Sequence, residues 1–126
     1  MKTLITILVI TYITAFNLSS TVAYANIEGP KPRTIIQAKV TGYNTVPEQT
    51  DSTPCVASSG DNICGRNDVV ACPRSIPLKT KVDIDGKEYI CLDRLALKYD
   101  NRFDISCDKD FECPYKVSGY KQVIIK

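Results

Sequence analysis

The chain of 126 residues contains no histidine. This absence excludes Ser-His and Cys-His nucleophile pairs and every metal site that uses imidazole ligands. Any acid–base catalysis must therefore fall to carboxylates. The cysteines show no Cys-x2-Cys spacing, so a zinc site is not expected, and the sequence gives no reason to expect a metal or another cofactor.

The sequence also lacks an apolar run long enough for a comfortable membrane span. The longest run, residues 4–16, follows Lys2 and precedes Ala23-Tyr24-Ala25, which is the pattern of a signal peptide with a small-x-small cleavage site. We expect residues 1–25 to be removed and the rest to be exported without a membrane span. Loss of Lys2 lowers the formal charge from +2 to +1, which gives no reason to expect nucleic-acid binding.

All six cysteines lie after the expected signal peptide, and an even number in a small exported domain predicts disulfides. They are Cys55, Cys64, Cys72, Cys91, Cys107 and Cys113. Fifteen pairings of six cysteines are possible, so the sequence leaves the connectivity open. Closeness along the chain favours Cys107–Cys113, and for the other four we predict Cys55–Cys64 with Cys72–Cys91. The compartment stays open between periplasm, outer envelope and medium.

The chain is predicted to be mainly β, because no window shows helical periodicity. Residues 26–34 contain one glycine and two prolines and are predicted to form an extended leader. Alternating apolar residues predict a strand at 35–43, and the polar stretch 44–67 is typical of a long loop. Asp85-Gly86 is a strong signal for a two-residue hairpin. Further strands are expected at 69–72, 81–84, 87–92, 103–106 and 120–125.

Six short strands joined by long loops favour a small closed barrel over an open sheet with exposed edges. The apolar positions of the alternating runs are expected to be buried. These positions are Ile36, Ala38, Val40, Val70, Val82, Ile84, Ile90 and Ile124.

Two aspartates are the leading candidates for catalysis. Asp93 and Asp104 lie eleven positions apart, each at the end of a strand-like run. Glycosidases that use two carboxylates need one to protonate the leaving oxygen while positive charge develops on the sugar. Each aspartate also lies close to an arginine, so a structural ion pair is the alternative interpretation.

Several segments resemble the three-aspartate (3D) domain family. Residues 69–82, VVACPRSIPLKTKV, resemble its "GviAvDPrvIPLGt"; Leu92-Asp93 resembles its "aeDtG"; and Arg102-Phe103-Asp104-Ile105 resembles its "nriDvy". The likeness extends to Val40-Thr41-Gly42-Tyr43, to Ala57-Ser58-Ser59-Gly60 where the family often has "TASG", and to residues 123–125. It covers residues 35–126, which we expect to form one domain.

The resemblance implies a double-psi β-barrel related to the C-terminal part of membrane-bound lytic transglycosylase A and to stationary-phase survival proteins that substitute for resuscitation-promoting factors. The expected activity is cleavage of peptidoglycan glycan strands between N-acetylmuramic acid and N-acetylglucosamine, carried out by a monomer. In the family the last of three aspartates is the catalytic acid/base, and it maps onto Asp104. The middle aspartate maps onto Asp93.

The sequence departs from the family pattern at three places. Cys72 stands where the family has its first aspartate, and a thiol in a disulfide cannot titrate or accept hydrogen bonds as a carboxylate does. Lys79 replaces the glycine of "IPLG", and Arg94-Leu95 replaces the glycines after the middle aspartate.

Further residues are candidates for substrate binding. Tyr43 ends the first predicted strand and either packs in the barrel or lines a glycan groove. By the resemblance, the turn Ser58-Ser59-Gly60 offers donors to sugar hydroxyls, and Arg94 and Arg102 are suited to muramyl-peptide carboxylates.

Two other functions remain open. One is a noncatalytic glycan-binding barrel that retains the groove. The other is a disulfide-stapled domain that binds a protein and uses its carboxylates only for structure.

Overall fold

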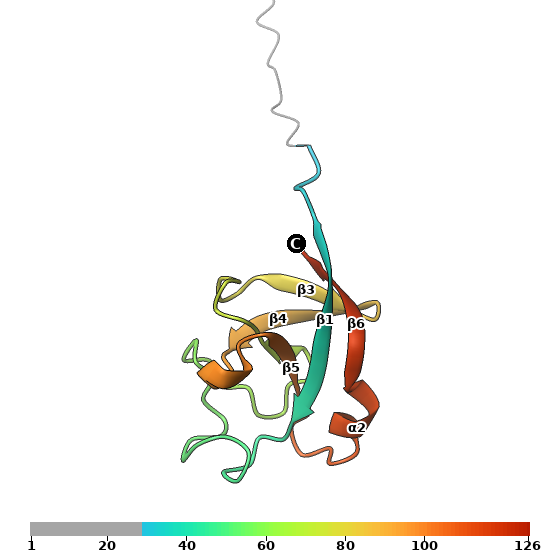
Figure 1. The fold of residues 1–126 in the computed structure, drawn as a ribbon. Helices are drawn as coiled ribbons and strands as arrows, with labels where there is room; N and C mark the ends of the chain where they lie inside the picture. The colour runs from blue at the N-terminus through green and yellow to red at the C-terminus, as the bar shows by residue number, and fades with distance from the viewer. Residues whose placement is uncertain (1–28) are drawn as a thin grey trace, which may run out of the picture.

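The computed structural model describes residues 29–126, which form a closed six-stranded β-barrel with almost no helix (Figure 1). Around the barrel the strands follow the order β1-β5-β2-β4-β3-β6. Their bounds are β1 Thr34–Tyr43, β2 Val69–Ala71, β3 Lys81–Ile84, β4 Lys87–Asp93, β5 Arg102–Ser106 and β6 Gly119–Ile125. The mainly β class and the closed barrel are therefore confirmed. The expected signal peptide lies outside the described residues.

Two strand pairs in the barrel are parallel. β1 pairs with β5 and β2 pairs with β4 in this way, whereas the other four pairings are antiparallel. The predicted hairpin is present between β3 and β4, where Asp85 and Gly86 have φ angles of 52° and 77°. Positive φ at both turn residues matches the twist of the flanking strands. Barrel closure leaves these six strands without an unpaired edge.

Buried apolar residues form two clusters on opposite faces of the sheet. The interior cluster fills the barrel: Val40, Val70, Cys72, Ile76, Val82, Ile84, Tyr89, Cys91, Phe103, Ile105, Cys107 and Val123. The outer cluster lies between the sheet and the loop formed by residues 44–68: Tyr43, Ala57, Ile63, Val69, Ala71, Leu92 and Leu95. Successive residues of β2 alternate between the two clusters, so this short strand is buried on both faces.

Four of the eight predicted core residues are buried: Val40, Val70, Val82 and Ile84. Three others, Ile36, Ala38 and Ile90, are half-buried and pack against the clusters. The prediction for Ile124 is wrong. Val123 is the fully buried residue of β6, because it pairs with Ile84 of β3, while Ile124 is only half-buried. Residues 123–125 are all β-branched and apolar, so they show no alternation that could indicate which of them faces the interior.

The three predicted disulfides are all present, with Cα–Cα distances of 4.9, 5.6 and 5.7 Å for Cys55–Cys64, Cys72–Cys91 and Cys107–Cys113. Cys72–Cys91 joins the residue after β2 to β4 inside the barrel, and Cys55–Cys64 closes part of the long loop. Three disulfides are consistent with an extracytoplasmic protein.

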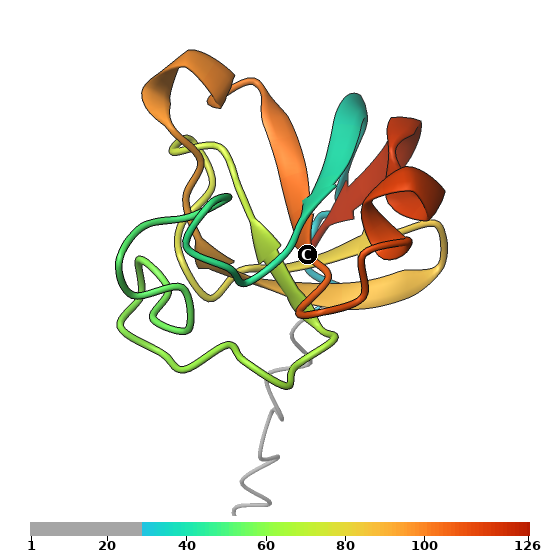
Figure 2. The ribbon, with the colours of Figure 1, turned by 90° about the horizontal axis from the view of Figure 1, so that it is seen from below.

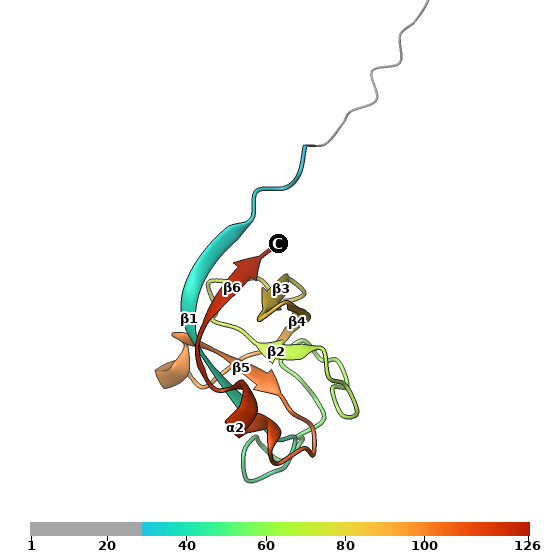
Figure 3. The same ribbon diagram turned by 90° about the vertical axis from the view of Figure 1, so that its right-hand side faces the viewer.

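Two short helical segments were not predicted, η1 at Leu97–Tyr99 and α2 at Cys113–Val117. Five residues or fewer are too short to show a helical period. The helix α2 packs against β1 (Figure 3). None of the helices within residues 29–126 has the length and apolar character needed to cross a membrane.

Candidate functional site

A cavity of about 550 Å³ lies on the outer face of the barrel. One wall comes from the long loop and the other from the segment that follows β4, and these two segments lie on the side of the barrel away from β6 (Figure 2). The lining residues are Tyr43, Gln49, Thr50, Asp51, Thr53, Pro54, Val56, Ala57, Ser58, Ala71, Asp93, Arg94, Leu95, Ala96, Tyr99 and Asp104.

The two candidate aspartates reach this cavity from either side of β2. Ala71 pairs with Asp93 of β4 on one side and with Asp104 of β5 on the other. Strands in a sheet lie about 4.8 Å apart, so two spacings place the two aspartate backbones about 10 Å apart. A register shift between Val70 and Ala71 brings Ala71 opposite Asp93. The small side chain of Ala71 leaves room between the carboxylates.

Asp93 is held by four hydrogen bonds. Its Oδ1 accepts from the backbone N–H of Ser58 at 3.0 Å, from Ser58 Oγ at 2.9 Å and from the backbone N–H of Arg94 at 2.9 Å. Its Oδ2 accepts from the Tyr43 hydroxyl at 2.9 Å. Hydrogen bonds to a charged acceptor are stronger than neutral ones. The carboxylate therefore fastens the long loop to β4 and to the end of β1.

Asp104 has a different environment. Its Oδ1 accepts one hydrogen bond, from Thr41 Oγ1 at 2.8 Å, and its Oδ2 accepts none from the described part of the chain. Burial raises the pKa of the Asp104 carboxyl; the Thr41 hydrogen bond and the charge of Arg102 oppose that rise, and the charge of Asp93 adds to it. The carboxyl therefore keeps its proton to a higher pH than an exposed aspartate does.

Tyr43 serves both the cavity and the outer cluster. Its ring packs in the outer cluster and only 7% of the residue is exposed, while its hydroxyl donates to Asp93. Burial raises the pKa of the Tyr43 phenol, and the negative charge of Asp93 and the hydrogen bond to it raise the pKa further. The phenol therefore remains a neutral hydrogen-bond donor.

The cavity brings together five of the eight predicted site residues: Tyr43, Ser58, Asp93, Arg94 and Asp104. Arg94 also has a structural contact, because its Nη1 donates to the carbonyl oxygens of Cys72 at 3.1 Å and Pro73 at 2.8 Å. These bonds hold the segment after β2 against the end of β4.

The other three predicted residues do not line the cavity. Ser59 Oγ donates to Asp61 at 2.7 Å, and Gly60 closes a turn with a φ of 86°. Arg102 stacks on Tyr99, with 4.5 Å between the guanidinium carbon and the ring centroid. Its Nε is buried and has no hydrogen-bond partner within the part of the chain described.

Sequence reasoning missed two groups of residues near the carboxylates. Thr41 holds Asp104 and shares the face of β1 that carries Tyr43; the two-residue spacing was a signal for this placement. Tyr99 and five loop residues also line the cavity, but they come from segments without periodicity; the loop residues are Gln49, Thr50, Asp51, Thr53 and Pro54. Nothing in the sequence indicated which of them face the site.

Comparison of the chain with protein-family models, with curated proteins and with solved structures finds no match. Within residues 29–126, no three His, Cys, Asp or Glu side chains gather closely enough to hold a metal ion.

Proposed function

We propose that the protein is an exported enzyme of the 3D-domain family that cleaves peptidoglycan glycan strands by a lytic transglycosylase reaction, with Asp104 as the acid/base. One observation carries the proposal: Asp104 lies beside a second carboxylate in one cavity and has an oxygen without a partner in the described chain. Burial raises the pKa of this carboxyl, in agreement with the role of an acid. A carboxyl that transfers protons needs both a retained proton and an accessible oxygen.

The backbone supports the family resemblance at a position where the sequence departs from it. Lys79 stands where the family has glycine, and its φ is 70°. This is the left-handed region, which glycine adopts far more readily than lysine. The two parallel strand pairs of the closed barrel are compatible with a double-psi barrel. The resembling segments at 69–82, 92–93 and 102–105 all contribute strands or strand ends to the cavity.

The reaction can be written with one carboxyl. Protonated Asp104 gives its proton to the oxygen that bridges the two sugars, and the bond between that oxygen and C1 of the muramyl residue breaks. The muramyl C6 hydroxyl attacks C1 and returns a proton to the Asp104 carboxylate. The product is a 1,6-anhydro ring, no water is consumed, and Asp104 is again protonated. Negative Asp93 stabilises the positive charge that develops on the sugar.

A noncatalytic glycan-binding barrel is the second candidate, and Cys72 favours it. Cys72 stands where the family has its first aspartate, yet its side chain is fully buried in the interior cluster and bonded to Cys91. Position 72 therefore supplies no carboxylate, and the family's first aspartate has no counterpart here. Such a protein would bind insoluble peptidoglycan without releasing products.

The deciding experiment incubates the purified protein with sacculi and analyses the soluble products by mass spectrometry. Anhydromuropeptides identify both the substrate and the reaction. Asp104→Asn should lower their release by a hundredfold or more, because loss of a general acid typically costs 10²–10⁴ in rate. Asp108→Asn is the matched control, since Asp108 also accepts a threonine hydroxyl, from Thr45 at 2.8 Å, but does not line the cavity.

Three results distinguish the two candidates. Product release by wild type and by the control, but not by Asp104→Asn, supports the enzyme. Equal release by Asp104→Asn contradicts the mechanism. Sedimentation with peptidoglycan without product release from wild type favours the binding module.

A further inference from the structure

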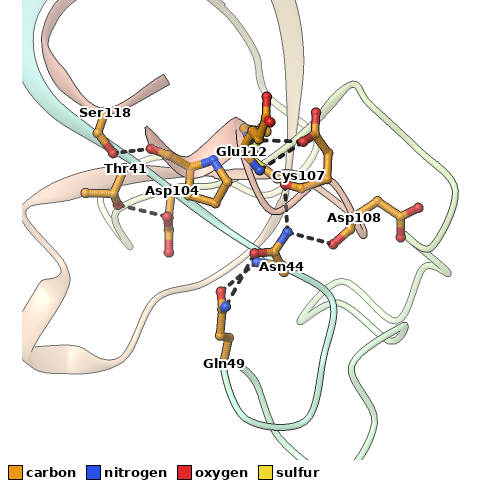
Figure 4. The surroundings of a disulfide bond; sticks show 11 residues. Thr41, Asn44, Gln49, Asp104, Cys107, Asp108, Glu112 and Ser118 are labelled. Carbon is orange, nitrogen blue, oxygen red and sulfur yellow. Dashed lines mark hydrogen bonds between the residues drawn. A yellow bond between two sulfur atoms is a disulfide. The ribbon is translucent and has the colours of Figure 1, made fainter. Parts of the chain in front are cut away.

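Thr41 and Asp104 face each other across the parallel pair β1 and β5. The two residues are Cα partners in the ladder, and Thr41 Oγ1 lies 2.8 Å from Asp104 Oδ1 (Figure 4). The Phe103 carbonyl oxygen lies 3.5 Å from the same hydroxyl, which is at the limit of a hydrogen bond. A threonine hydroxyl has one proton to donate, so the shorter contact to the carboxylate takes it.

The threonine side chain is well suited to fix a carboxyl group. Its β-branched side chain has few χ1 rotamers, so the hydroxyl has few positions on a strand. Val40 and Gly42 on either side keep β1 in register with Phe103 and Ile105 of β5. The orientation of Asp104 is thus set by the barrel through one hydrogen bond.

We propose that Thr41 is a positioning residue for Asp104. The Thr41 hydroxyl engages Asp104 Oδ1 and leaves Asp104 Oδ2 as the oxygen that transfers the proton. The proposal rests on the function proposed above. With Oδ1 occupied as an acceptor, the proton of the neutral acid resides on Oδ2. Without Thr41 the carboxyl can turn and present either oxygen, so a smaller share of the molecules is aligned for transfer.

Other charged or titratable groups also act on Asp104. Arg102 from β5 favours its ionised form, and Asp93 at the end of β4 disfavours it. Tyr43 from β1 is a neutral phenol bonded to Asp93. None of these groups changes when Thr41 is replaced, so a change in the Asp104 titration after that replacement reports on Thr41 itself.

The test compares Thr41→Val, which keeps the shape and removes the hydroxyl, with Thr41→Ser, which keeps the hydroxyl. Thr45→Val is the matched control, because it removes the same type of threonine–aspartate bond from Asp108, outside the cavity. The carboxyl carbon of Asp104 is followed by NMR in protein labelled with carbon-13 aspartate, across a pH series. Its signal is identified by its absence from the Asp104→Asn spectrum. Thr41→Ala replaces Thr41→Val if the latter does not fold.

We expect Thr41→Val to titrate Asp104 at a higher pH than wild type, because the hydrogen bond that favours the ionised form is lost. Thr41→Ser and Thr45→Val should titrate Asp104 as wild type does. In digests of sacculi, Thr41→Val should lower kcat about tenfold with little change in KM, and Thr41→Ser should restore it. Because the reaction starts from protonated Asp104, the alkaline limb of the rate profile should move to higher pH.

Two results overturn the proposal: an unchanged Asp104 titration in Thr41→Val, or a shift in Thr41→Ser as large as that in Thr41→Val. The titration of Asp104 does not depend on catalysis, so failure of this proposal can be distinguished from failure of the proposed function. If the titration shifts as expected but wild type releases no anhydromuropeptides, the pairing of Thr41 with Asp104 stands and the enzymatic role of both residues fails.

Discussion

Replacing Asp93 in two ways tests whether it fastens the loop or transfers protons. Asp93→Asn keeps an oxygen at the Oδ1 position, where Ser58 and Arg94 donate three hydrogen bonds. The new amide nitrogen replaces Oδ2 and can donate to the Tyr43 hydroxyl. That hydroxyl then accepts a hydrogen bond from residue 93 instead of donating one. Asp93→Ala removes the acceptor for all four donors. The two variants should therefore differ strongly in stability.

The magnitudes follow from the exposure of each donor. Ser58 is exposed, so water replaces its lost bonds at small cost, whereas the buried Tyr43 hydroxyl loses its partner at a cost of about 1–3 kcal/mol. Including the Arg94 N–H, we expect Asp93→Ala to lower the free energy of unfolding by about 3 kcal/mol. Asp93→Asn exchanges charged for neutral bonds and should cost about 1 kcal/mol.

Urea unfolding followed by far-UV circular dichroism, with the disulfides intact, measures both free energies. The same variants are then assayed on sacculi, where Asp93→Asn should retain more turnover than Asp104→Asn, because a supporting group usually costs less than the group that transfers the proton. Equal stability of the alanine and asparagine variants would refute the assignment of Asp93 as the anchor of the loop. Turnover by Asp93→Asn as low as that of Asp104→Asn would refute the division of roles.

Two further predictions concern stability. The pKa of Asp104 in the folded state lies above its ordinary value of 3.8, so stability from the protonated carboxyl is lost as pH rises through that folded pKa. Asp104→Asn should therefore raise the urea midpoint relative to wild type at about pH 7, and the difference should shrink towards about pH 3. Gly42→Ala should lower the free energy of unfolding by about 1–3 kcal/mol, because a Cβ there would lie 2.8 Å from Pro114 Cα and Val117 Cγ2. Gly29→Ala is the control: a Cβ there would meet nothing within 4 Å, so this variant should be neutral in the same unfolding assay.

Much of the barrel could be predicted because its strands are short and well marked. Alternation of apolar and polar residues located β1, and the Asp85-Gly86 turn placed the bounds of β3 and β4 to within one residue. The phase of β6 could not be predicted, because residues 123–125 are all β-branched and the register with β3 decides which side chain faces inward. Closeness along the chain favoured Cys107–Cys113, which is present. The same guide does not select the other two bridges, because Cys64 is nearer in sequence to Cys72 than to Cys55; the barrel decides their pairing by bringing Cys72 beside Cys91.

The candidate site was harder to predict, because it depends on contacts between segments far apart in sequence. The family resemblance implied a common site for Asp93 and Asp104, and both residues lie beside Ala71. The sequence did not show that the long loop returns to Asp93 through Ser58, or that Ser59 and Gly60 in the same turn face elsewhere. Loop residues carry no period, so their direction is set only by the folded barrel.

The different roles of the two aspartates follow from the strands to which they belong. Asp93 is the last residue of β4, where the chain leaves the sheet, so the next backbone N–H and the long loop can turn towards its carboxylate. Asp104 is in the middle of β5, so the expectation that it ends a strand is wrong. There the backbone N–H groups are engaged by β1 and β2, and only the Thr41 side chain reaches the carboxyl. A carboxylate at a strand end gathers donors and anchors structure. A carboxyl within a strand is desolvated with few donors, which is the condition that raises its pKa and suits it to acid–base chemistry.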